Sequence, residues 1–324
     1  DGKNWSGGSS GNIDISEVWP DGSDRITALA AYQNFLIIFG KRSIVIYSGA
    51  DNPATMALAD TVANIGSVGR DTVQSTGRDL LFVDYSGVRS FARTVRTNTM
   101  PVGDISRNVS SDFKGFVNAA DVAKIRTIFH PRESFYLVTF PNLGMVYCFD
   151  TRSPLEDGSY RTTTWSGMSP LCFTRNTSDQ LYIGVKDGFG EYKGHKDDTA
   201  SYELSYFSHP LAFGDSSRLK FLKSVTVTTF NGAGSNVTLQ WAYDYAQDYT
   251  KQVYTLSEDF AGQYNNAQYN TTSQYSSSAV LINREKVGTN GHGTVVQIGL
   301  STTVDGREIA IQQMNVHSLI GRMV

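Results

Sequence analysis

Short apolar runs separated by tight turns recur along the first two thirds of the chain. In Arg78–Arg93 the apolar run Leu80–Val83 meets the turn Asp84–Gly87, and Val88 and Phe91 then resume the apolar pattern. Glycine at such a turn can adopt positive φ, which tight hairpin turns require. This stretch therefore predicts a β-hairpin whose second strand ends at Arg93. The expected core residues are Leu81, Val83 and Phe91, and the expected turn residues are Asp84 and Ser86.

The same pattern occurs three more times, at Phe35–Tyr47, Phe135–Phe149 and Leu181–Tyr192. The four turn positions are Ser43, Gly87, Gly144 and Gly188, and their spacings are 44, 57 and 44 residues. A repeat of ~40–50 residues with several strands per unit is typical of β-propeller blades. The sequence thus predicts an all-β protein that begins with a β-propeller, split or incomplete in this chain.

We expect about four blades in residues 1–200, together with an N-terminal remnant that contains a strand at Ile13–Trp19. No strand is expected in Ala50–Ala63, which reads as irregular. A short helix within Phe113–Lys124 would account for the wider second interval. No segment has a sustained helical period of apolar residues, and the best candidate, Asn118–Lys124, is only about two turns long.

The pattern changes after about residue 200, where the strands become longer. Arg218–Phe230 alternates apolar and polar residues over its whole length, and Val237–Tyr245 runs back after a glycine-rich turn. Further strands are expected at Gly293–Val304 and Ile309–Ile320. Long strands without the blade period predict a β-sandwich-like domain over residues 201–324.

A long loop rich in Tyr, Asn and Ser is expected at about 258–290 within this second domain. Tyrosine is favoured at protein interfaces because it offers a rigid amphipathic contact. One interpretation is therefore an arm that contacts a neighbouring subunit, and the other is a surface loop without a function. The candidate interface residues are Tyr264, Tyr269 and Tyr275.

Composition adds two constraints. Charged residues make up 18 % of the chain, below the ~25 % usual for soluble domains. The net charge of −3 argues against tight binding of nucleic acid, which requires clustered Lys and Arg. A channel wall past which DNA merely moves remains compatible with this charge.

Residues able to perform catalysis are present but not in catalytic patterns. The five histidines have no metal-ligand spacing, and no phosphate-binding loop, nucleophile elbow or dinucleotide fingerprint occurs. Aspartates cluster in turns, where Asp is common for conformational reasons. Cys148 and Cys172 lie in apolar strand contexts and are expected to be buried free thiols. We expect no enzymatic activity, cofactor, metal or small-molecule substrate. The turn aspartates are Asp84, Asp157, Asp187 and Asp305.

Four stretches carry a resemblance to a known family. They are ALAAYQNFLIIFGKRSIVIYSG (28–49), IGSVGRDTVQSTGRDLLFVDYSGVRSFART (65–94), HPLAFGDSSRLKFLKSVTVTTFNG (209–232) and REIAIQQMNVHSLIGR (307–322). Together and in this order they resemble the tail nozzle, or packaged-DNA stabilisation, proteins of short-tailed bacteriophages. The resemblance covers about two thirds of the chain, and the N-terminal region departs from it.

The resemblance implies a structural virion protein of the phage tail that is made in the host cytoplasm. It implies a homo-oligomer, as a six-fold ring, that contacts the portal or adaptor and tail-fibre or needle proteins. DNA would pass through the ring without specific binding. Two other functions stay open: a carbohydrate- or receptor-binding propeller on a virion or cell surface, and a hydrolase with two facing carboxylates ~5–9 Å apart.

Overall fold

The computed structural model describes residues 15–52, 55–97, 104–256, 260–262, 273–275 and 282–323. The chain divides into a first unit, Asp1–Tyr192, and a second unit, Lys193–Val324. Within the described residues both units consist mainly of antiparallel strands, so the predicted all-β class is confirmed. None of the described sheets closes on itself.

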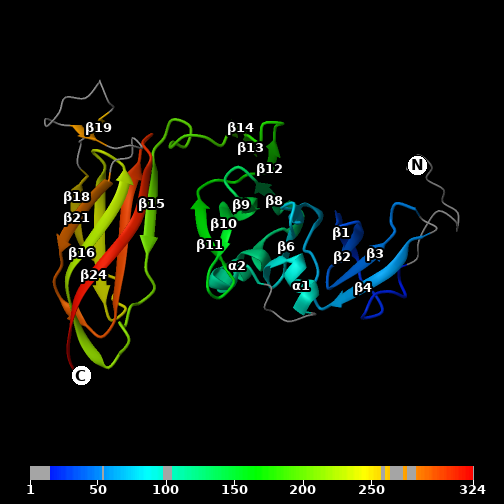
Figure 1. Cartoon of the computed structure of the whole chain (residues 1–324), viewed down its shortest axis with the longest axis horizontal. Coiled ribbons are helices and arrows are strands. Elements are labelled where there is room, and N and C mark those ends of the chain that lie inside the picture. The colour runs from blue at the N-terminus through cyan, green and yellow to red at the C-terminus, as the bar shows by residue number, and fades with distance from the viewer. Residues whose placement is uncertain are drawn as a thin grey trace. The chain divides into compact units, whose positions relative to one another are not determined.

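The first unit contains four antiparallel sheets, which Figure 1 shows in chain order. In each of them, consecutive strands are hydrogen-bonded neighbours. The first sheet contains β1 (Ile26–Tyr32), β2 (Phe35–Gly40), β3 (Ser43–Ser48) and β4 (Ala57–Ala63). The second contains β5 (Gln74–Ser75), β6 (Leu80–Asp84) and β7 (Gly87–Ser90). The third contains β8 (Arg126–His130), β9 (Phe135–Phe140), β10 (Met145–Pro154) and β11 (Tyr160–Ser166). The fourth contains β12 (Cys172–Arg175), β13 (Leu181–Val185) and β14 (Gly188–Glu191).

All four predicted hairpins are confirmed. They are the pairs β2–β3, β6–β7, β9–β10 and β13–β14. Ser43, Gly87 and Gly188 each begin the second strand of their hairpin, and Gly144 precedes β10 in the left-handed conformation. The repeat seen in the sequence is therefore a repeat of hairpins, each of which lies within one sheet.

Strand β6 is buried on both of its faces. Leu80 and Phe82 pack into the apolar cluster that contains the first sheet, whereas Leu81 and Val83 pack into the cluster that contains the third sheet. A strand covered on both sides reads as a continuous apolar run, because neither face alternates with polar residues. The run Leu80–Val83 is therefore apolar throughout because the second sheet lies between two others.

Strand β9 has the same property one layer further on. Tyr136 and Val138 face the cluster shared with the second sheet, while Phe135 and Leu137 face a cluster that includes Ile183 of the fourth sheet. The four sheets are therefore stacked in chain order, with an apolar layer between each neighbouring pair.

The expected second strand of the hairpin at residues 78–93 ends earlier than predicted. It ends at Ser90, and Phe91 begins helix α1 (Phe91–Thr97). Ser90 Oγ accepts a hydrogen bond from Arg93 N (3.2 Å), and Asp79 Oδ1 accepts one from Ala92 N (2.9 Å). These acceptors satisfy N–H groups at the start of the helix. Phe91 is buried as predicted, but from a helix.

Two further expectations near the N-terminus are wrong. Residues 16–19 form turns and not a strand, and the beginning of the expected strand at 13–14 lies outside the described residues. Conversely, β4 occupies Ala57–Ala63, where no strand was expected. Most of β4 is exposed and small or polar, so it lacks the apolar signal of the other strands.

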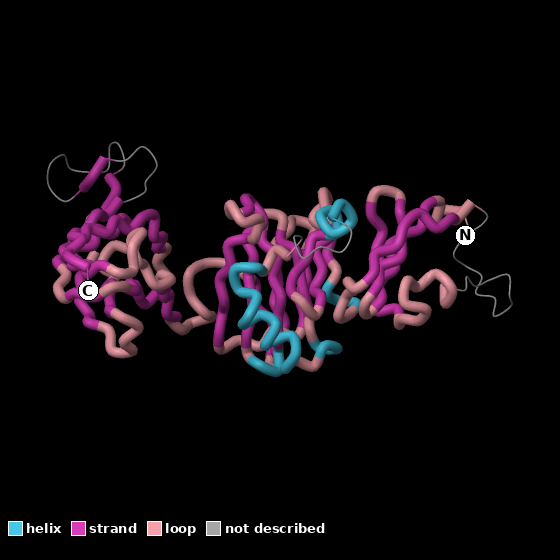
Figure 2. Tube along the Cα trace, turned by 90° about the horizontal axis from the view of Figure 1, so that it is seen from below, coloured by secondary structure: helices cyan, strands magenta, loops and turns pink. Residues whose placement is uncertain are grey.

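Both described α-helices belong to the first unit (Figure 2). Helix α2 (Ser110–Ala119) confirms the helix expected in Phe113–Lys124, and it buries Phe113 and Val117. Among the described residues no helix is long and apolar enough to cross a membrane. The short 3₁₀ helices are η1 (Arg70–Thr72), η3 (Arg107–Val109), η4 (Val122–Lys124) and η5 (Pro141–Leu143).

The second unit has two sheets that share one core. The first of them is ordered β15-β23-β17-β18, and in the other β16 lies between β21 and β24, with β22 at the end of β16. Buried residues from β16, β17 and β23 form a single cluster, so the two sheets pack face to face as in a sandwich. The strands are β15 (Tyr202–Phe207), β16 (Arg218–Asn231), β17 (Asn236–Tyr243), β18 (Thr250–Thr255), β21 (Ile282–Gly288), β22 (His292–Gly293), β23 (Val296–Val304) and β24 (Ile309–Met323).

The long loop expected at 258–290 is interrupted by strands. β21 pairs along β16 and buries Asn283 and Val287, so Ile282–Gly288 belongs to the sandwich and not to a loop. β19 (Phe260–Gly262) and β20 (Ser273–Tyr275) form a short parallel pair. The rest of 257–281 lies outside the described residues.

Replacing Gly87 with Val should lower the free energy of unfolding by about 1–3 kcal/mol. Gly87 has φ +147°, and an added Cβ would lie 2.8 Å from Asp104 Oδ1 and closer still to Ser106 Oγ. The matched control is Gly188→Val, because Gly188 occupies the same hairpin position, has no left-handed φ and has open space around it. Denaturant titration should show a change within about 0.5 kcal/mol for the control. Equal stability of Gly87→Val and wild type would contradict the assigned turn.

Candidate functional site

The hairpin β6–β7 contains a buried ion pair. Asp84 Oδ2 lies 3.4 Å from Arg89 Nε, and both side chains are buried. Asp84 also accepts hydrogen bonds from Ser86 N (3.1 Å) and Gly66 N (3.4 Å). Removing one partner of such a pair leaves an uncompensated buried charge, which is strongly destabilising. Asp84 therefore stabilises the hairpin as well as forming part of its turn. Its carboxylate is engaged in these structural contacts.

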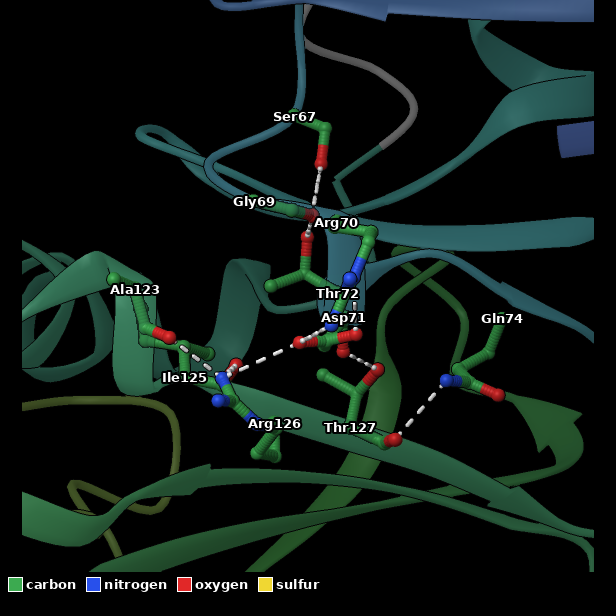
Figure 3. A network of polar contacts seen from close by, with 10 residues as sticks. All are labelled: Ser67, Gly69, Arg70, Asp71, Thr72, Gln74, Ala123, Ile125, Arg126 and Thr127. Atoms are coloured by element: carbon green, nitrogen blue, oxygen red, sulfur yellow. Dashed lines mark hydrogen bonds and ion pairs between the residues drawn. The ribbon is translucent and has the colours of Figure 1, made fainter. Parts of the chain in front are cut away.

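A second polar network joins the second and third sheets (Figure 3). Thr127 Oγ1 on β8 donates to Asp71 O (2.9 Å), and Gln74 Nε2 on β5 donates to Thr127 O (3.0 Å). Arg126 Nη1 lies 3.5 Å from Asp71 Oδ2 and also donates to Ala123 O (2.7 Å). These polar groups bond one another, so the network fixes η1 and β5 against β8. It offers scaffold chemistry and not a reactive centre.

Clusters that could hold a metal ion are absent from the part of the chain that the structure describes. No three His, Cys, Asp or Glu residues there come together as a metal site. Asp157 Oδ1 accepts from Ser159 N (3.0 Å) and Ser159 Oγ (2.6 Å), which is a turn arrangement, and Asp305 pairs with Lys196 (2.8 Å). Asp157 is thus held within its own turn, whereas Asp305 pairs with a lysine from a distant part of the sequence.

The two cysteines differ from the prediction of two buried thiols. Both are free, but Cys148 is half-buried, whereas Cys172 is exposed. Cys148 contributes to the apolar layer between the third and fourth sheets. Burial raises the pKa of the Cys148 thiol to about 12. Cys172 lies on the opposite face of the fourth sheet, and the strand pattern alone does not reveal which face a neighbouring sheet covers.

His130 is a buried packing residue at the end of β8. Its ring centroid lies 5.0 Å from that of Phe135, and its Nδ1 is buried without a hydrogen-bond partner. Burial lowers the pKa of His130, against the opposing influence of Glu133, and Arg175 lowers it further. The neutral ring is therefore the form that fits this layer.

A shallow depression of about 510 Å³ lies in the second unit. It is lined by Trp241, Thr250, Lys251, Gln252, Gly288, Thr289 and Asn290. The Trp241 side chain is only 3 % exposed, and its Nε1 donates to Asn290 O (3.0 Å). Polar residues therefore line most of the depression, and its tryptophan presents no exposed ring face to a ligand.

Apolar residues line the outer face of the first sheet, here called the first end face, and those at its centre are buried. This face contains two cross-strand rows, Leu29–Ile38–Val45 and Leu36–Tyr47–Leu58. Trp19 packs over the centre of the face. Leu29 and Leu58, on the two outermost strands, remain 61 % and 49 % exposed.

The outer face of the fourth sheet, here called the second end face, also exposes an apolar side chain. Cys172, Gly184 and Phe189 form a cross-strand row on this face, and Phe189 is 81 % exposed. Thr174, Tyr182 and Glu191 form the adjacent row. Neither end face was predicted from the sequence. Phe189 and Leu29 could have indicated these faces, because each is an apolar residue on the face of its strand opposite to the core residues.

The predicted interface tyrosines are not brought together among the described residues. Tyr264 and Tyr269 lie outside them, and Tyr275 ends β20. Their role at a subunit contact stays a prediction. Another edge exposes aromatic side chains instead: Tyr202, Tyr206 and Phe207 are all exposed on β15, an edge strand of its sheet.

Thiol accessibility gives a direct test of the stacked sheets. In the native protein, an aromatic disulfide reagent should modify Cys172 rapidly and Cys148 slowly, because thiolate is the reactive form and burial raises the pKa of Cys148. Cys172→Ser should abolish the fast phase, and Cys148→Ser should leave it intact. Equal fast rates for both thiols would show that the layer between the third and fourth sheets is open.

Acid should destabilise the first unit through His130. The unfolded chain binds a proton on this residue near pH 6.5, whereas the folded chain binds it only at lower pH. Stability contributed by the neutral ring is therefore lost as pH falls below about 6.5. Thermal unfolding at about pH 7.5 and about pH 5.5 should show a larger loss for wild type than for His130→Phe. Equal losses of thermal stability in wild type and His130→Phe would show that other groups cause the acid sensitivity.

Comparison with known proteins assigns no family to this chain. No protein-family model matches it, and no curated protein matches it either. Among solved structures, a Cry1Da tryptic core variant from Bacillus thuringiensis is similar at 6 % identity with a TM-score of 0.24. The match covers 91 % of this chain and 50 % of that structure, so this chain spans about half the length of its neighbour. A likeness at this level carries no argument about fold or function.

Proposed function

We propose that this chain is a structural subunit of the ring-shaped tail nozzle of a short-tailed bacteriophage. In this role it retains the packaged genome, forms the channel for its ejection and attaches to the portal or adaptor. The chain acts as a homo-oligomer, as a six-fold ring, in the virion tail. It needs no cofactor or small-molecule substrate and has no enzymatic activity. Tail-fibre or needle proteins are its further partners.

The main support is the stack of sheets in the first unit. Four successive antiparallel sheets, each built around a hairpin, share apolar layers and buried polar links. Such sheets have the character of propeller blades, and we propose that they form a split or incomplete β-propeller in this chain. A channel subunit has to withstand force without reacting, and this construction suits that demand.

The composition of the chain supports the proposed passage of DNA without binding. The chain has a net charge of −3 and a charged fraction of only 18 %. Tight nucleic-acid binding releases counterions through many Lys and Arg contacts, and it would retard a moving genome. A mildly acidic wall suits passage without binding.

A carbohydrate- or receptor-binding function gains no support from the depression in the second unit. Sugar recognition commonly uses an exposed aromatic ring face beside polar groups, and the Trp241 side chain in the depression of the second unit is buried. We therefore propose no second function.

The test is the position of the protein in its native particle. Electron microscopy of virions labelled with an antibody against this chain should place it in a ring at the tail vertex. The same antibody after particle disruption should detect a homo-oligomer. Absence of the chain from purified virions, or label confined to distal fibres, would overturn the proposal.

A further inference from the structure

One aromatic cluster joins the third sheet to the fourth. Tyr192 directly follows β14, and its backbone N donates to Leu181 O (2.8 Å), so it extends the fourth sheet. The ring of Trp165 stacks on that of Tyr192, with centroids 5.7 Å apart and planes 7° apart. The centroids of Phe135 and His130 lie 5.6 Å and 6.4 Å from that of Tyr192. Three rings of the third sheet therefore contact one ring of the fourth.

His130 is the member of this cluster that titrates near neutral pH. The residue is only 3 % exposed, and its Nδ1 is buried without a hydrogen-bond partner. In the neutral ring Nδ1 can remain an acceptor, whereas protonation makes both ring nitrogens donors. An imidazolium at this position would bring a charge and an unpaired N–H group into an apolar layer, which is strongly unfavourable.

The charged groups around His130 do not compensate for a proton on its ring. Arg132 and Glu133 follow it in the β8–β9 turn, and both are exposed to water, which screens their charges. Arg175 ends β12, and its Nη1 lies 3.2 Å from Asp179 Oδ1 in the turn between β12 and β13. The Asp179 carboxylate is thus already paired. A protonated His130 would add a positive charge near two arginines.

We propose that His130 is a pH-sensitive switch between the third and fourth sheets. Protonation drives its ring out of the apolar layer toward water, which removes a contact of Tyr192 and releases the fourth sheet from the third. The layer that opens contains Leu137 and Leu181, together with the side chain of Cys148. The first three sheets stay together, because the two apolar clusters that join them contain no residue of the fourth sheet.

The switch lies at the end of the first unit. The second unit begins at Lys193, so a released fourth sheet lengthens the connection that leads into it. The change needs no ligand, and it is reversible because neutral pH restores the uncharged ring. This inference concerns packing within the first unit and does not rest on the proposed function.

The thiol of Cys148 reports the opening of this layer. In a Cys172→Ser background it is the only thiol of the chain. Its rate of modification is measured with a dipyridyl disulfide, which reacts with thiols in acid as well as at neutral pH. Dividing this rate by that of a short unstructured peptide thiol at the same pH removes the pH dependence of the reaction itself. Between about pH 7.5 and about pH 5 the ratio should rise, by about tenfold if the pKa of His130 is one unit lower in the closed form than in the open form.

Two histidine variants assign the response. His130→Phe places an uncharged ring in the same layer, so its ratio should not change between the two pH values. His317→Phe is the matched control, because His317 is exposed and belongs to the second unit. This control should keep the full acid response. Circular dichroism at neutral pH should show that both variants are folded.

Hydrogen exchange of the wild type gives a second result, which does not depend on the folding of His130→Phe. After correction for the intrinsic pH dependence of amide exchange, acid should remove protection from β12–β14 and leave β1–β3 and β6 protected. The inference is overturned if the Cys148 ratio does not rise in acid or if the rise persists in His130→Phe. Loss of protection to the same extent in all four sheets would also overturn it.

Discussion

The first unit depends on the burial of one short strand from both sides. β6 contributes Leu80 and Phe82 to one apolar layer and Leu81 and Val83 to the next, and no residue of the strand is free to face water. Deleting any of these side chains would open a cavity in a layer that two sheets share, at a typical cost of about 2–5 kcal/mol. The buried Asp84–Arg89 ion pair links the two strands of this hairpin next to its turn.

The same packing accounts for the order of the sheets in the first unit. Each neighbouring pair of sheets shares one apolar layer, so every sheet gains its stability from contacts with the sheet before or after it. Buried polar contacts, such as those of Thr127 with Asp71 and Gln74, link the second and third sheets as well. The proposed nozzle subunit would use this stack as a stiff scaffold.

Much of the local structure could be predicted from the sequence, because hairpin turns have local chemistry. Gly87, Gly144 and the apolar runs beside them specify their strands within a few residues. Helix α1 could not be predicted in this way, because one of its caps comes from Asp79, which precedes the hairpin. β21 was missed because most of its residues are polar and its position depends on pairing with β16, more than fifty residues earlier. The outward placement of Cys172 and Phe189 depends on where the stack ends, which no local pattern records.

The most direct test is a reconstruction of the assembled wild-type chain by electron cryomicroscopy at a resolution that separates β-strands. We expect the copies to close into a six-fold ring in which each first unit keeps its four stacked sheets. A chain that stays monomeric, or an assembly that does not close into a ring, would contradict this account.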